Sequence, residues 1–166
     1  GHFFLMANRN KRSIVLDLKA ERGREAFLKL VEKMDVVICS IRPAAMDRLG
    51  LGYDDCRAVN PKIIYVALVG FGQSGPYAKR PAYDDIIQGV SGMADMQGGR
   101  NGPPTFVNAS VCDKICSQVA AHSTLAALFS RQQTGAGQLV EVPMFESMVG
   151  FNLIEHHSGQ TFDPPL

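Results

Sequence analysis

Residues 62–69 read KIIYVALV, a nearly unbroken run of apolar and β-branched side chains. Such a run is typical of a strand in a parallel sheet that is covered on both faces. A second nearly continuous apolar run, DVVIC at residues 35–39, predicts another buried parallel strand. Between the two runs, residues 43–48 begin with Pro43 and fit a short helix, and residues 54–59 fit one or two further helical turns.

The sequence before these runs repeats the same alternation. Residues 13–18, SIVLDL, form a short β-rich run that predicts a strand. From residue 20 to residue 33 apolar side chains recur at helical spacing, at Ala26, Phe27, Leu30 and Val31. The order strand, helix, strand, helix, strand predicts an α/β fold with a parallel sheet and flanking helices.

After residue 69 the alternation of apolar strand-like runs with short helices ends. Residues 70–81 and 96–105 are rich in glycine and proline and predict two loops, with a helix between them over residues 83–93. A long alanine-rich helix is predicted over residues 112–131. It is followed by a turn at 134–137, a strand at 138–142 and a helix from Pro143 to His157.

Length and composition narrow the class of protein. The 166 residues are 46% hydrophobic and 20% charged, which excludes a disordered polymer and a collagen-like repeat. The 17 basic and 16 acidic residues give a net charge of +1, which argues against a generic nucleic-acid binder. No apolar run is long enough for a membrane helix. We expect a single α/β domain over residues 1–166, cut from a longer polypeptide.

Four cysteines at irregular spacing indicate a reducing cytoplasm rather than a disulfide-rich secreted domain: Cys39, Cys56, Cys112 and Cys116. Cys112 and Cys116 are one helical turn apart, but His122 lies elsewhere on the same predicted helix. With no fourth ligand in the pattern we expect no metal site, and we interpret these cysteines as core residues.

Residues 70–75, GFGQSG, match the GxGxxG pattern and follow a predicted strand. A dinucleotide-binding loop needs its third glycine inside the helix that opens there. Pro76 and Pro81 follow instead, and no helical periodicity begins. A substrate-side loop at the carboxyl end of the strand is the favoured interpretation, because ligands of open α/β sheets gather at that edge.

Basic side chains cluster in two places near predicted strand boundaries. Residues 8–12, NRNKR, carry three cations and fit either a solvated turn or a phosphate clamp. Arg42 and Arg48 come shortly after the strand at residues 35–39. The two clusters together favour a small anionic ligand at this side of the sheet.

Asp113 is the carboxylate that stands out, because it follows an uncharged run and begins a predicted helix. One interpretation is structural, since Asp is well suited to a helix cap or first turn. The other is catalytic: a carboxylate kept ionised by a helix start can attack an acyl carbon and form an anhydride. The residues alone leave both interpretations open.

Five segments in order carry a resemblance to a known family: NRNKRSIVLDLK at 8–19, DVVICSIRPAAMDRLGLGY at 35–53, NPKIIYVALVGFGQSGP at 60–76, PAYDDIIQGVSG at 81–92 and RQQTGAGQLVEVPMFE at 131–146. The sequence resembles the class III CoA-transferases, the family of formyl-CoA:oxalate and carnitine CoA-transferases. The resemblance covers nearly the whole chain. It implies a portion of the family's Rossmann-like large domain.

The resemblance also implies an activity and a site. The family moves CoA between an acyl-CoA donor and a carboxylic acid through an aspartyl-CoA thioester, so CoA is a substrate and not a tightly bound cofactor. The nucleophilic Asp falls at Asp113, with Tyr83 and Asp84 as supporting residues beside it. The implied CoA-binding positions are Leu16, Ser40, Ile41, Ala45 and Arg48, with Arg48 expected to contact a phosphate.

Partners and alternatives follow from the same resemblance. It implies acyl-CoA and a small carboxylic acid as partners, a cytoplasmic homodimer, and neither nucleic acid nor membrane. The related α-methylacyl-CoA racemases carry a catalytic His at the position of Tyr83, and racemisation needs two acid/base groups. A racemase-like enzyme is therefore the second hypothesis, and a non-catalytic CoA-binding or dimerising fragment is the third.

The sequence departs from the family pattern shortly after Asp113. Residues 115–117, ICS, stand where the family often has glycine.

Overall fold

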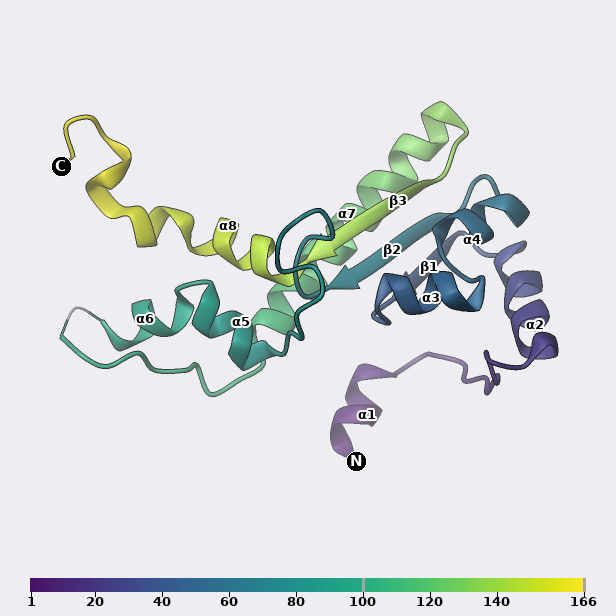
Figure 1. The fold of residues 1–166 in the computed structure, drawn as a ribbon, viewed down its shortest axis with the longest axis horizontal. Coiled ribbons are helices and arrows are strands. Elements are labelled where there is room, and N and C mark those ends of the chain that lie inside the picture. The colour runs from purple at the N-terminus through teal and green to yellow at the C-terminus, as the bar shows by residue number, and fades with distance from the viewer. Residues whose placement is uncertain (100, 166) are drawn as a thin grey trace.

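A three-stranded parallel sheet organises the computed structural model, which describes residues 1–99 and 101–165 (Figure 1). Its strands are β1 (Val36–Cys39), β2 (Ile64–Val69) and β3 (Gln138–Pro143), and β2 lies in the middle. Ile64 of β2 is aligned with Val36 on one side and with Gln138 on the other. All three strands therefore end at the same edge, called the carboxyl edge below.

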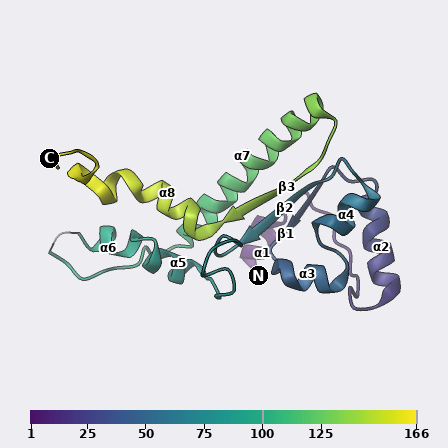
Figure 2. The ribbon, with the colours of Figure 1, turned by 45° about the horizontal axis from the view of Figure 1, so that its top comes forward.

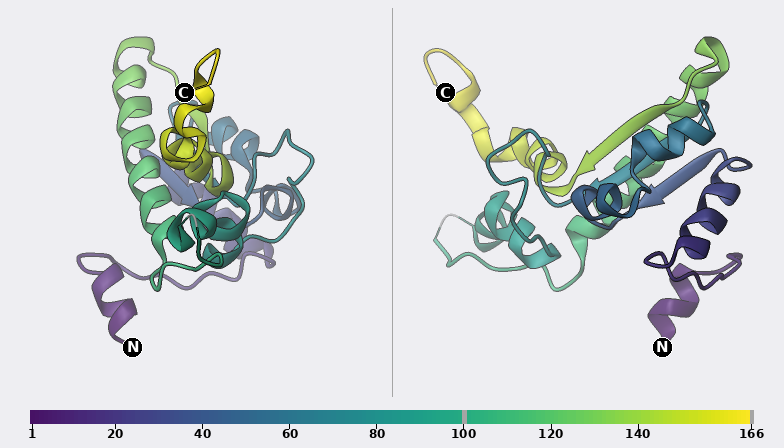
Figure 3. Two further views of the ribbon diagram at one scale, coloured as in Figure 1. Left: turned by 90° about the vertical axis from the view of Figure 1, so that its left-hand side faces the viewer. Right: turned by 45° about the vertical axis from the view of Figure 1, so that its right-hand side comes forward.

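Helices cover both faces of the sheet (Figures 1 and 3). One face carries α7 (Val111–Thr134), and Ile64 and Val66 pack with Ala120 and Ala127 of that helix. The other face carries the three helices α2 (Glu21–Val31), α3 (Pro43–Leu49) and α4 (Tyr53–Val59). This double cover explains why the strand at residues 62–69 reads as a continuous apolar run.

The second face is packed by the alternate residues of β2. Tyr65, Ala67 and Val69 share a buried cluster with Val31, Met46, Leu51 and Cys56 from the helical layer. Successive side chains of a strand point to opposite faces. The two buried clusters therefore fix which residues of β2 face which helices, and a register shift would exchange them.

Three helices extend beyond the carboxyl edge (Figures 1 and 2): α5 (Asp84–Val90), α6 (Met93–Gly98) and α8 (Met144–His157). A third buried cluster joins them to the start of α7 and contains Phe71, Ile87, Cys112, Cys116 and Met148. At the ends of the described chain lie α1 (His2–Ala7) and the 3₁₀-helix η1 (Ser158–Thr161).

The predicted alternation of strands and helices from residue 20 onward is confirmed, but the strand predicted at residues 13–18 is wrong. Residues 11–17 form neither helix nor strand, and Ile14 and Val15 are 64% and 93% exposed. A β-rich run becomes a strand only when a neighbouring strand offers it a ladder of hydrogen bonds. In the described residues β1 has no second neighbour, so this run is left unpaired.

Three further expectations need correction. β1 is an edge strand rather than a fully buried one, with Ile38 61% exposed. The helix predicted over residues 83–93 is two helices, because Gly92 adopts a φ of +83° and breaks the helical path. The loop predicted over 96–105 begins later, since α6 continues to Gly98; residue 100 of this loop lies outside the described residues.

Candidate functional site

The start of α7 lies at the carboxyl edge of the sheet. The Cys116 thiol, in the second turn of α7, donates to the carbonyl of Met144, which directly follows β3, across 3.8 Å. Asp113 lies in the first turn of α7, and its side chain is exposed. The sequence prediction that this Asp begins a helix is confirmed. Its position puts a carboxylate where open α/β sheets bind their ligands.

Asp84, at the start of α5, reaches the first turn of α7. Its Oδ2 accepts a hydrogen bond from the backbone N–H of Asp113 across 2.9 Å. The first amides of a helix have no partner within the helix, and Ser110, the residue before α7, makes no capping bond with its side chain. Asp84 therefore supplies from another helix the cap that Ser110 does not.

The surroundings of the Asp113 carboxyl alter its acidity. Partial burial raises the pKa of Asp113 above its ordinary value, and the negative charge of Asp84 raises it further. Within the described residues, the Asp113 carboxyl oxygens have no hydrogen-bond or ion-pair partner. An exposed, unpaired and more basic carboxylate is available to attack an electrophile or to take up a proton.

Gln88 forms a hydrogen bond with the other oxygen of Asp84, and the sequence analysis did not single this residue out. Its side chain is fully buried, and its Nε2 donates to Asp84 Oδ1 across 2.7 Å. Its Oε1 accepts from the backbone N–H of Val107 across 2.8 Å. The spacing of four residues between Asp84 and Gln88 on a predicted helix is the signal that would have suggested their pairing.

The loop at residues 70–75 is anchored at the carboxyl edge by two glutamates. The Gly72 N–H donates to Glu146 Oε1 across 2.9 Å, and the Gln73 N–H donates to Glu141 Oε1 across 3.0 Å. No helix opens within this loop; the next helix is α5. The prediction of a loop without a dinucleotide-type helix start is confirmed.

Four of the five positions implied for CoA lie on the β1 and α3 side of the same edge. Ser40 and Ile41 follow β1 directly and are exposed, and Ala45 and Arg48 lie on α3, with Arg48 exposed. Leu16 is half-buried in the irregular segment before α2. Ser40 and Ile41 therefore share the carboxyl edge with Asp113, although they stand at the other end of the row of strands.

Tyr83 immediately precedes α5 and is 75% exposed. Within the described residues its side chain makes no hydrogen bond and no ring contact. The structure thus joins Asp84 to Asp113 by a direct bond but does not join Tyr83 to either residue.

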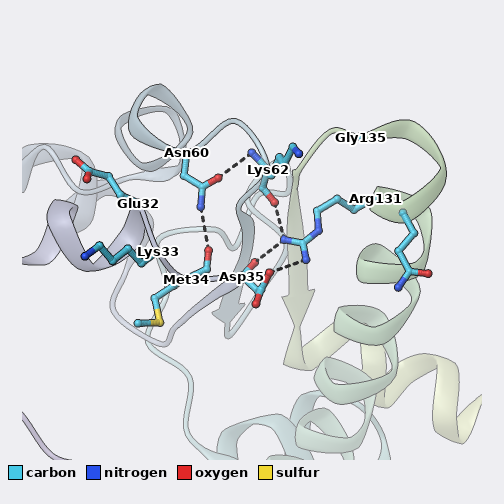
Figure 4. A pocket seen from close by; sticks show the side chains of 9 residues that line it. Glu32, Lys33, Met34, Asp35, Asn60, Lys62, Arg131 and Gly135 are labelled. Carbon is cyan, nitrogen blue, oxygen red and sulfur yellow. Dashed lines mark hydrogen bonds and ion pairs between the residues drawn. The ribbon is translucent and has the colours of Figure 1, made fainter.

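A hollow of about 470 Å³ lies at the opposite edge of the sheet (Figure 4). The Arg131 guanidinium donates there to the backbone carbonyls of Asp35 and Lys62 across 3.3 and 3.0 Å, and it pairs with Asp35 Oδ1 at 2.7 Å. Arg131 is 18 residues from Asp113 along α7, about 27 Å at the helical rise per residue. We interpret these contacts as structural ones that join the end of α7 to the beginnings of β1 and β2.

A second hollow, of about 330 Å³, lies between the end of α5 and α8. Asn152 lines it; its Nδ2 donates to the carbonyl of Ser91 across 3.2 Å, while its buried Oδ1 has no hydrogen-bond partner among the residues that the structure describes. The ring of His156 lies against Gly92 at the break between α5 and α6. None of the predicted site residues lies in this hollow.

Cys112 and Cys116 are buried and free, as the core interpretation predicts. Burial is the main reason that the pKa of the Cys112 thiol is raised to about 12, and the charge of Asp84 adds to it. In the described part of the chain no three His, Cys, Asp or Glu side chains gather as a metal site would require. Nor does any helix described there combine the length and apolar character needed to cross a bilayer.

Comparison with known proteins adds to this geometry. A model of the CoA-transferase family III matches residues 1–163. The acetyl-CoA:oxalate CoA-transferase of Acetobacter aceti is 43% identical over 150 residues, which are 90% of this chain and 39% of that protein. The succinyl-CoA:mesaconate CoA-transferase of Haloarcula hispanica is 39% identical over 153 residues, again 90% of this chain and 39% of that protein.

A solved structure shows the same fold. The CAIB/BAIF family protein from Brucella suis superimposes with a TM-score of 0.89 at 35% sequence identity, over 94% of this chain and 41% of that one. This likeness confirms the α/β fold class. The chain spans about two fifths of the length of the proteins that it matches.

Proposed function

The chain belongs to the CoA-transferase family III, and from this premise we propose that it takes part in moving CoA from an acyl-CoA donor to a carboxylic acid, with Asp113 as the nucleophile. The observation that carries the proposal is the exposed, unpaired carboxylate of Asp113 at the start of α7, whose backbone N–H is held by Asp84. The relatives named above are CoA-transferases that differ in their acids, so the proposal stops at the class of acid.

The proposed first steps use only atoms that the substrates and Asp113 supply. One Asp113 oxygen attacks the thioester carbonyl, the carbon–sulfur bond breaks, CoA leaves as a thiolate, and Asp113 stays joined to the acyl group as a mixed anhydride. The thiolate then attacks the Asp113 carbonyl, and the donor acid leaves as a carboxylate. The acceptor carboxylate attacks the carbonyl of the resulting aspartyl-CoA thioester and displaces the CoA thiolate, which gives a second mixed anhydride. The thiolate attacks the acceptor's carbonyl carbon, the bond from that carbon to the Asp113 oxygen breaks, and the new acyl-CoA and the free Asp113 carboxylate are formed.

Two features of the site support this role. The positive end of the α7 dipole favours a charged carboxylate in the first turn. The raised pKa of Asp113 makes that carboxylate more basic than a freely solvated one. The dipole offsets part of the penalty on the charged form, and the raised pKa makes the ionised carboxylate a better donor of an electron pair.

For CoA itself we propose the β1 and α3 side of the carboxyl edge, with Leu16, Ser40, Ile41, Ala45 and Arg48. The exposed guanidinium of Arg48 is suited to a charge-assisted hydrogen bond with a phosphate. Ser40 and Ile41 stand where β1 ends, and the α/β rule for ligand position favours this place. An Arg48→Gln variant should weaken CoA binding and leave the thermal midpoint unchanged.

We also propose that the active form is a homodimer. Apolar side chains of α8 are strongly exposed, with Phe151 at 58% and Ile154 at 80%. Exposed apolar side chains of this kind mark interaction surfaces when they are contiguous. Sedimentation of the protein over a range of concentrations tests this, and a monomer at all concentrations would contradict it.

The test of the chemistry is intact-protein mass spectrometry after incubation with a panel of acyl-CoA thioesters. The wild-type protein should gain an adduct that maps to Asp113 and is released by hydroxylamine, and Asp113→Asn should gain none. Retained CoA transfer in Asp113→Asn would overturn the assignment of the nucleophile. Saturable CoA binding without any adduct would instead support a non-catalytic CoA-binding fragment.

A further inference from the structure

We propose that Gln88 is a positioning residue that holds Asp84 and the segment before α7 in the arrangement that presents Asp113. This inference rests on the proposed role of Asp113 and deepens it. Gln88 does not face the substrate side of the edge, because its side chain is completely buried. It acts through its hydrogen bonds to its neighbours.

The Gln88 amide joins two parts of the chain that flank Asp113. Its Nε2 donates to Asp84 Oδ1 across 2.7 Å, and the carbonyls of Val107 and Ala109 lie 3.3 and 3.4 Å from the same nitrogen. Its Oε1 accepts from the Val107 N–H across 2.8 Å. The segment 107–109 leads directly into α7, so one side chain fixes both the entry to the helix and the carboxylate that caps it.

The arrangement orients Asp84 at both of its oxygens. Oδ1 is held by Gln88, and this leaves Oδ2 directed at the N–H of Asp113, 2.9 Å away. If Oδ1 is released, the carboxyl can rotate and the first turn of α7 loses its cap. A displacement of about 1 Å at a reacting group can lower a rate by about 100-fold, so the orientation matters for the chemistry.

The position needs an amide rather than an apolar or acidic group. Leu at position 88 would leave Asp84 Oδ1 and the Val107 N–H, which are partly buried, without these partners. Glu at position 88 has nearly the same shape as Gln and keeps an acceptor for the Val107 N–H. Once ionised, however, it places a second negative charge next to the Asp84 carboxylate. A buried Glu beside a negative charge has a raised pKa, so the introduced carboxyl would donate to Asp84 at low pH and repel it at high pH.

Hydrogen exchange of single amides tests the positioning independently of any chemistry. In Gln88→Leu the Asp113 and Val107 amides should exchange about tenfold faster or more, while the Val66 amide in the central strand stays unchanged. Gln118→Leu, which removes an exposed glutamine of α7, is the matched control and should change none of them. Unchanged exchange at Asp113 in Gln88→Leu, or equal acceleration at Val66, would overturn the proposal.

Steady-state kinetics of CoA transfer by the active protein then distinguish a positioning role for Gln88 from a role in stability alone. Gln88→Glu should show a wild-type KM for acyl-CoA and a kcat that falls as the pH rises, which the wild type and Gln118→Glu should not show. A pH profile with no such fall would overturn the proposal. Failure of this inference can be told apart from failure of the proposed function. If Asp113 is not the nucleophile, Asp113→Asn keeps its activity. If Asp113 is the nucleophile but Gln88 does not position it, the wild type still forms its adduct at Asp113.

Discussion

Asp84 Oδ2 accepts the backbone N–H of Asp113 across 2.9 Å, so the carboxylate that begins α5 caps the helix that carries the proposed nucleophile. The two residues are 29 positions apart in the chain. The bond places a negative charge beside Asp113, and this charge adds to burial in raising the pKa of Asp113. One contact therefore determines both the local structure of the helix start and the acidity of its carboxyl group.

Asp84→Asn removes the charge and keeps one acceptor for the Asp113 N–H. The amide nitrogen of Asn then faces Gln88 Nε2, so the bond to Gln88 is lost, and the readout is the pKa of Asp113 rather than stability alone. The negative charge is lost, so we expect the pKa of Asp113 to fall toward its ordinary value. A titration of the Asp113 carboxyl carbon by NMR measures this directly, and the acid limb of adduct formation should move to lower pH.

The same change should alter how stability depends on pH. A carboxyl whose pKa is raised in the folded state favours folding while protonated, and its stabilising contribution is lost as the pH rises through the folded-state pKa. Asp84→Asn should therefore reduce the part of that loss that Asp113 contributes. Asp85→Asn, on the exposed side of α5, is the control. An Asp113 pKa that moves equally in both variants would contradict the assignment to Asp84.

Gly72→Ala should disturb the loop at the carboxyl edge. An added Cβ would stand 2.6 Å from Glu146 Oε1, the atom that accepts the Gly72 N–H. The end of the Glu146 side chain can turn away from the added methyl group, but the hydrogen bond is then lost, so we expect a loss of about 0.5–1.5 kcal/mol in the free energy of unfolding. In Gly75→Ala the nearest atom is 3.4 Å away, an ordinary contact, so this control should unfold close to wild type in urea.

Gly150→Ala should stabilise the protein. Gly150 lies inside α8 and is exposed, and no atom of the described residues lies within 4 Å of the Cβ that Ala would add. Ala is favoured over Gly in a helix by about 1 kcal/mol. Gly23→Ala should do the opposite despite its helical position, because its Cβ would collide with the carbonyl of Asp17. Thermal unfolding followed by circular dichroism compares the two, and a rise in the midpoint for both would refute the steric argument.

The thiols should resist alkylation while the protein is folded. All four cysteines are buried, and burial raises the pKa of Cys56 to about 11 and of Cys112 to about 12. The thiolate is the reactive form. We expect essentially no labelling by iodoacetamide at pH 8 in native buffer and complete labelling in denaturant, read out by intact mass. Rapid native labelling of Cys112 would show that the start of α7 opens.

Arg131 should matter to stability more than its acidic partner does. Arg131 donates to two backbone carbonyls as well as to Asp35, and its side chain is 19% exposed against 75% for Asp35. Exposed ion pairs contribute about 0–1 kcal/mol. Asp35→Asn should therefore cost about 0.5 kcal/mol or less, and Arg131→Met about 1–3 kcal/mol. Equal losses in urea unfolding would assign the stabilisation to the ion pair instead.

The sequence predicted the strands and helices wherever packing follows from local pattern. Residues 62–69 become the central strand because their side chains alternate between two buried clusters. Gly135 ends α7 with a φ of +73°, close to where the predicted helix gave way to a turn. The run at residues 13–18 failed as a strand for a reason outside its own composition, since a strand also needs a partner beside it.

The sequence by itself determined the order of elements, the place of Asp113 at a helix start and the segments that resemble the family. Through the resemblance it also predicted Tyr83 and Asp84 as supporting residues beside Asp113, but not which atoms either residue would contact. Only the tertiary structure brought Asp84 onto the Asp113 amide and buried Gln88 behind it. The physical reason is that helical periodicity follows from residues three or four apart. The cap depends instead on how α5 packs against α7, which the buried cluster of Ile87, Cys112 and Met148 decides.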